Sequence, residues 1–86
     1  MRAIIRFSVD GEKNSALRNQ LVGQLEAAGF TRFGNTATWE NNHISAQGLG
    51  NAVRDFWTNA ATHNGPGRID HYWMYCDRTE LGSVPN

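Results

Sequence analysis

The first ten residues place the strongest constraint on the fold. Four apolar residues alternate there with residues that are mostly polar: Ala3, Ile5, Phe7 and Val9. A period of two indicates a β-strand with one buried face, and Asp10-Gly11 ends it with turn residues. We therefore expect this strand to lie inside a sheet, with neighbours along both of its edges.

A helix is predicted directly after this strand. Apolar residues recur at three- and four-residue spacing: Leu17, Leu21, Leu25 and Ala28. Asn14 or Ser15 is the expected N-cap. Gly29 is expected to end the helix in a left-handed conformation, which would bring Phe30 against Leu25.

A β-hairpin is the expected structure of the next segment. Residues 31–40 are predicted to form a strand with a bulge or bend at Gly34-Asn35, and Phe33 and Trp39 are expected on the same face. Asn41-Asn42 is a plausible tight turn, because Asn tolerates a positive φ. Residues 43–46 would then form a short return strand.

The second half of the chain predicts one more helix and one more strand. The helix has an apolar stripe made of Leu49, Val53, Phe56, Trp57 and Ala60, and its glycines favour a start after Gly50. Residues 68–78 form the last predicted strand. Ile69, His71, Trp73 and Tyr75 would share one of its faces. Both faces carry large side chains, so we expect both to be covered, one of them by a second subunit.

This order of elements predicts an α+β fold. Strand, helix, strand, short strand, helix and strand is the split βαβ arrangement of ferredoxin-like domains, βαββαβ. Two helices would cover one face of an antiparallel sheet and leave the other face open to solvent or to a partner. We expect one domain over residues 1–78 and a loose C-terminal tail over residues 79–86.

Composition excludes some functions. The chain has 86 residues, eight basic and eight acidic, and no net charge, which argues against strong nonspecific binding to DNA or RNA. Cys76 is the single cysteine, so no intrachain disulfide is expected. No signal peptide or membrane span is predicted, and the expected location is the cytoplasm. A chain this small would gain stability from forming a homodimer.

Polar residues of the first strand are the candidates for catalysis. Arg6, Ser8 and Asp10 fall on one face or at the strand's end, and the last strand offers Asp70. Two carboxylates close together could hold a divalent cation. The alternative, which we favour, is that Asp10 only begins the Asp-Gly turn.

Aromatic residues are the candidates for binding a partner. The proposed contact set is Tyr72, Trp73, Tyr75, Trp39 and Arg68. On an open sheet face they would form a stacking platform of the kind used by proteins that bind single-stranded RNA. A core and dimer interface is the more common explanation of such residues. We interpret His71 as a packed residue of the sheet.

The N-terminal half resembles a known grouping. A strand from Met1 that ends near an Asp, a helix that closes in Gly29-Phe30 and a strand with Arg32 resemble the small CRISPR-associated endoribonuclease subunit. The outline is also similar to virulence-associated protein D and to a ferredoxin-like antitoxin RNase. The resemblance implies a ferredoxin-like homodimer and, for the first family, a metal-bound Asp at the end of strand one, where this chain offers Asp10.

Three functions follow as hypotheses. The first is a small dimeric binding or regulatory module that contacts a protein or RNA partner through its open sheet face. The second is a metal-dependent endoribonuclease that uses Asp10 with Mg²⁺, assisted by Ser8 and Arg6. The third is a small-molecule sensor with its ligand between the sheet and a partner subunit. A cofactor is predicted only for the second.

Overall fold

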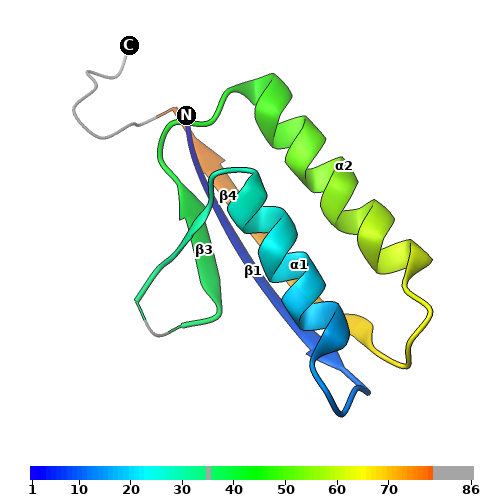
Figure 1. The fold of residues 1–86 in the computed structure, drawn as a ribbon. Helices are drawn as coiled ribbons and strands as arrows, with labels where there is room; N and C mark the ends of the chain where they lie inside the picture. Colours follow the sequence, from blue (N-terminus) through cyan, green and yellow to red (C-terminus); the bar gives the residue numbers. More distant parts are fainter. Residues whose placement is uncertain (35, 79–86) are drawn as a thin grey trace.

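The chain folds into a four-stranded antiparallel sheet with two helices on one side (Figure 1). The computed structural model describes residues 1–34 and 36–78, so the predicted loose tail at 79–86 lies outside the described residues. The elements are β1 (Arg2–Asp10), α1 (Ala16–Ala27), β2 (Thr31–Arg32), β3 (Thr38–Asn41), α2 (Ala46–Thr62) and β4 (Arg68–Asp77). The strand order is β2-β3-β1-β4. This arrangement confirms the predicted α+β, ferredoxin-like fold.

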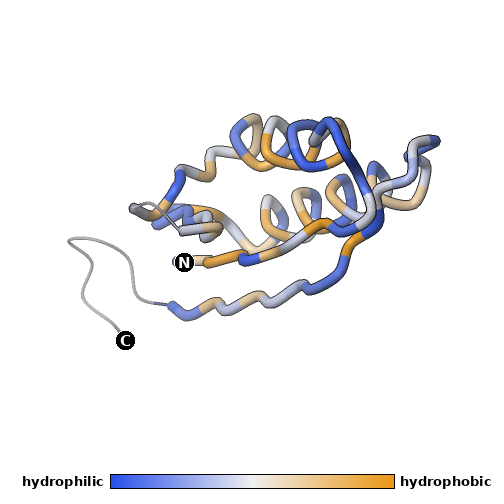
Figure 2. The backbone as a smooth tube through the Cα atoms, turned by 90° about the horizontal axis from the view of Figure 1, so that it is seen from below, coloured by the Kyte–Doolittle hydropathy of each residue, from blue (hydrophilic) through white to orange (hydrophobic). Residues whose placement is uncertain are grey.

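β1 is an inner strand, as predicted. Ile5 lies opposite Trp39 of β3 on one edge and opposite Met74 of β4 on the other. Ala3, Ile5 and Phe7 are buried beneath the helices, which lie together on one side of the sheet (Figure 2). The alternation in the sequence therefore marks the core face correctly.

The start of α1 is stabilised by a residue that sequence reasoning missed. Ser15 has φ 58° and makes no side-chain hydrogen bond to the helix. The two oxygens of the Glu12 carboxylate instead accept hydrogen bonds from the backbone N–H groups of Leu17 (2.9 Å) and Arg18 (3.0 Å). Asn14 Oδ1 accepts the N–H of Ala16 at 3.2 Å. A negative charge at this end also complements the helix dipole.

The end of α1 is the predicted one. Gly29 has φ +89°, its N–H donates to the carbonyl of Glu26, and the N–H of Phe30 donates to the carbonyl of Leu25. These two bonds define a Schellman motif, which normally brings an apolar residue onto the helix. Phe30 is accordingly buried in the core.

The hairpin after α1 lies earlier in the chain than predicted. Residues 31–40 are not one strand, because the N–H of Phe33 bonds to the carbonyl of Thr38 and closes a turn that includes Gly34 at φ +62°. The predicted return strand at 43–46 is wrong. Ser45 is the N-cap of α2, where its Oγ accepts the N–H of Gly48 at 3.0 Å. The cap also explains why α2 begins at Ala46 and not after Gly50.

A β-bulge in β4 changes which residues share a face. Ser8 lies opposite His71, but Val9 lies opposite Ile69, so Asp70 is left without a direct partner. The predicted grouping of Ile69 with His71, Trp73 and Tyr75 is therefore wrong for Ile69, which packs against the core. An extra residue in one strand shifts the alternation by one position.

An aromatic cluster joins β4 to α2. Phe56 lies edge-on to Phe7, with ring centroids 5.1 Å apart, and 5.3 Å from Tyr72. The ring centroids of Trp57 and Tyr72 lie 4.9 Å apart.

In the described part of the chain, neither helix is long and apolar enough to cross a membrane.

The Glu12 cap predicts a loss of stability on mutation. Glu12→Ala removes both acceptors from the first turn of α1, and we expect the free energy of unfolding to fall by about 1–2 kcal/mol. Urea denaturation followed by circular dichroism measures this change. Glu26→Ala is the matched control on the same helix, because the Glu26 side chain is exposed. Equal losses in the two variants would contradict the capping role.

Tyr72 predicts a dependence of stability on pH. Burial raises the pKa of the Tyr72 phenol above its ordinary value of 10.0, partly offset by Trp57. Above the ordinary pKa the unfolded chain loses this proton first, so stability is lost as the pH rises through the raised pKa. Tyr72→Phe should remove this part of the loss. Urea denaturation of both proteins between about pH 8 and pH 11 tests it, and identical slopes would contradict it.

Candidate functional site

The face of the sheet opposite the helices carries the candidate site. We call it the open face, and its pairs across β1 and β4 are Arg2 with Asp77, Ile4 with Tyr75, Arg6 with Trp73, and Ser8 with His71. Residues directly opposite each other in an antiparallel pair point to the same side of the sheet. Since Ala3, Ile5 and Phe7 are buried on the helix side, the even-numbered residues of β1 must point outward.

Two aromatic rings form a parallel, stacked pair on the open face. The rings of Trp73 and Tyr75 are nearly parallel, at 10°, with centroids 6.2 Å apart. They are 51% and 42% exposed, respectively. Exposed aromatic residues that gather on one face of a sheet are a typical feature of binding surfaces. We call these two residues the aromatic platform.

Arginines flank the aromatic platform on β1. The guanidinium of Arg2 lies 5.8 Å from the centroid of the Tyr75 ring and forms a 2.9 Å ion pair with Asp77. The hydrogen bond and the charge of Asp77 raise the pKa of Arg2. Arg6 is exposed directly opposite Trp73. The two cations therefore lie beside the two rings on the neighbouring strand.

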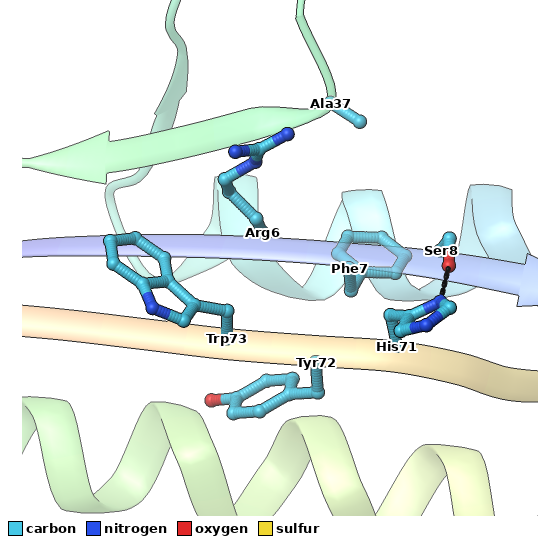
Figure 3. A pocket seen from close by; sticks show the side chains of 7 residues that line it. All are labelled: Arg6, Phe7, Ser8, Ala37, His71, Tyr72 and Trp73. Carbon is cyan, nitrogen blue, oxygen red and sulfur yellow. Dashed lines mark hydrogen bonds between the residues drawn. The ribbon is translucent and has the colours of Figure 1, made fainter.

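A cavity of about 580 Å³ lies on this part of the sheet (Figure 3). The indole of Trp73 extends over β1, and the Arg6 side chain points toward β3. The lining residues are Arg6, Phe7, Ser8, Ala37, His71, Tyr72 and Trp73. Trp73 thus lies at one end of the hollow and Ser8 with His71 at the other, while Phe7 and Tyr72 direct their rings to the helix side of the sheet.

The polar side holds a serine, a histidine and an aspartate that do not form a catalytic triad. His71 Nδ1 lies 2.8 Å from Asp70 Oδ2 and 3.4 Å from Ser8 Oγ. In a triad the serine and the carboxylate meet opposite nitrogens of the ring, so that the base can take the serine proton. Here both meet the same nitrogen, and the His71 side chain is 83% exposed. The side chains of Ser8, His71 and Asp70 are therefore suited to hydrogen bonding.

The carboxylate of Asp10, at the end of β1, has partners close to it. Asp10 Oδ1 accepts the N–H of Gly11 at 2.9 Å, and Asp10 lies opposite Arg68. Arg68 donates to the carbonyl oxygens of Gly65 and Gly67 at 2.7 and 2.6 Å. Over residues 1–34 and 36–78, no three His, Cys, Asp or Glu side chains are grouped closely enough to hold a metal ion. The metal-dependent role of Asp10, with Ser8 and Arg6, remains a prediction.

Two of the expected platform residues lie on the other face. Trp39 is buried in the core, and Tyr72 is half buried against Phe56 and Trp57. Figure 3 shows the Tyr72 side chain pointing toward α2. The platform interpretation is therefore wrong for these two residues and the alternative of a place in the core is right, because Trp39 lies opposite the inward-facing Ile5 and Tyr72 opposite the inward-facing Phe7.

Sequence reasoning also missed members of the site. His71 is exposed and bonded to Asp70, not packed in the sheet as interpreted. Arg2 was not considered, although its spacing of four residues from Arg6 places both on one face of a strand. Asp70 was grouped with Ser8 and Asp10 from the sequence, and the structure brings it to 3.4 Å from Ser8, but the bulge that places it there left no clear signal in the sequence.

Comparisons with known proteins assign no relative. No protein-family model matches the chain, and neither the curated proteins nor the solved structures searched yield a match.

Proposed function

We propose that this protein is a binding module that takes single-stranded RNA on its open face. The observation that carries the proposal is the aromatic platform, with Trp73 and Tyr75 nearly parallel and exposed. Base–aromatic stacking accepts any base, because every base has a π-face. The exposed ring of Trp73, the larger of the two, thus offers a place for an unstacked base beside Tyr75.

The two arginines beside the aromatic platform suit the phosphate backbone of a single-stranded RNA. Arg6 and Arg2 lie on β1, beside the rings on β4. A guanidinium offers up to five N–H donors in a planar fork that matches phosphate oxygens. A strand whose bases stack on Trp73 and Tyr75 would bring its phosphates over these arginines.

The polar side chains of Ser8, His71 and Asp70, at the other end of the open face from Arg2, would orient the bound RNA strand. Ser8 and His71 supply hydrogen-bonding groups within reach of a base edge, whereas the Asp70 carboxylate repels phosphate. Base edges are therefore favoured at this end and phosphates at the arginine end.

The charge of the chain indicates how such binding is driven. With eight cations balanced by eight anions, few phosphates are neutralised, and stacking must supply most of the affinity. A duplex gains little from this face, because its bases are already stacked and its charge finds few partners. Preference for single strands over duplex is expected.

The aromatic platform predicts the effect of removing one ring. Trp73→Ala should weaken binding of a fluorescently labelled single-stranded RNA roughly 5- to 100-fold, the usual worth of one stacked base. Fluorescence anisotropy measures the affinity, with a duplex of the same sequence for comparison. Phe33→Ala is the matched control, because Phe33 is another exposed aromatic residue but lies in the turn between β2 and β3.

Two results would contradict this proposal. One is the absence of single-strand binding, which would leave a protein as the partner of the surface. The other is an equal loss of affinity in Trp73→Ala and Phe33→Ala. The same RNA incubated with Mg²⁺ or with EDTA also tests the endoribonuclease alternative, which requires cleavage that is lost in Asp10→Ala.

Salt dependence gives a separate prediction. The logarithm of the binding constant should fall with the logarithm of salt concentration with a slope of about −0.7 per neutralised phosphate, and so about −1.4 if both arginines engage. Arg6→Gln should make the slope shallower by about 0.7, while Asp70→Asn, which removes a negative charge on the same face, should raise the affinity. An unchanged slope in Arg6→Gln would exclude a phosphate contact at Arg6.

A further inference from the structure

The outer edge of β4 can pair with another strand. The strand order β2-β3-β1-β4 gives β4 a single neighbour, and no other strand of residues 1–34 and 36–78 lies along its outer side. An edge strand presents unpaired N–H and C=O groups that can extend the sheet with another chain. The opposite edge, β2, is only two residues long, whereas β4 has ten.

The middle of β4 lacks the usual protection of an edge. Residues 72–76 are Tyr-Trp-Met-Tyr-Cys, with no proline and no charged side chain, and these are the residues that normally prevent an edge strand from pairing. Four of the five large hydrophobic residues exposed in the described chain lie on β4 or on α2: Trp57, Trp73, Met74 and Tyr75. The apolar surface thus reaches both sides of this edge.

We propose that the outer edge of β4 binds a second copy of this chain, antiparallel, with the two Met74 residues facing each other. A two-fold axis through Met74 makes the contact self-complementary and closed. The uncharged segment Tyr72–Cys76 is centred on Met74, so this register pairs the whole segment with itself.

The side chains of β4 favour this register. It places Trp73 of each copy opposite Tyr75 of the other, and His71 opposite Asp77, on the open face. Aromatic pairs and polar pairs of complementary type both stabilise neighbouring strands. The two nearest registers that keep the faces aligned are worse, because one puts Asp77 opposite Trp73 and the other puts Asp70 opposite Cys76.

Pairing in this way would join the two open faces into one. Both sheets would continue across the two-fold axis with their helices on the same side, and the two aromatic platforms would become neighbours. This pairing does not rest on RNA binding, and its tests contain no RNA, so either proposal can fail alone.

The first test is the mass of the protein in solution. Sedimentation equilibrium of the full chain should give twice the 9.6 kDa of one copy. Met74→Lys places two like charges opposite each other and should give the mass of one copy. Phe33→Lys introduces a lysine at an exposed site away from β4 and should leave the mass doubled. Circular dichroism confirms that each variant is folded. A wild-type chain of single mass, or a loss of the doubled mass in Phe33→Lys, would overturn the proposal.

The second test reads the register from disulfide formation. Met74→Cys in a Cys76→Ala background should link two chains on mild oxidation, because residues opposite themselves have Cβ atoms about 4.5–5.5 Å apart. Trp73→Cys and Tyr75→Cys in the same background, and the native Cys76, should link more slowly, because each is displaced along the strand from its own copy and the Cβ atoms lie beyond the distance that a disulfide spans. Fastest linkage at another position would overturn the pairing through Met74.

Discussion

The structure depends on the pairing of β1 along both of its edges. Ile5 has Trp39 on one side and Met74 on the other, so the orientation of β1 sets the orientation of the whole sheet. Because side chains alternate along a strand, one choice of face sends Ala3, Ile5 and Phe7 into the core and leaves Arg2, Arg6 and Ser8 on the opposite side. The orientation of β1 therefore determines both which side chains enter the core and which form the candidate site.

Two helices are enough to cover only one face of this sheet. Over residues 1–34 and 36–78 both helices lie on the same side of the sheet. The open face carries Trp73 and Tyr75, which the described part of the chain leaves exposed to water at a cost in free energy. A bound partner that covers them would recover that free energy, which is the physical basis of the proposed function.

β4 contributes to both proposals through different groups. Trp73 and Tyr75 offer their rings on the open face, while the backbone of the same strand offers hydrogen bonds at its outer edge. The two uses are compatible, because a sheet extended by a second copy still leaves its open face uncovered. Joined sites also bind a long strand more tightly than separate ones, since the second contact becomes intramolecular.

Local patterns in the sequence determined the element types, the inward face of β1 and the Schellman end of α1 at Gly29-Phe30, because each depends on neighbours a few residues apart. The open-face positions of Trp73 and Tyr75 also followed the simple alternation. The Glu12 cap and the earlier hairpin join residues only five positions apart, but no periodic pattern signals them. Tertiary structure alone decided the bulge at Asp70 and the burial of Trp39 and Tyr72. Backbone closure and the packing of distant segments determine those features, and no periodicity within a single segment records which distant residues will meet.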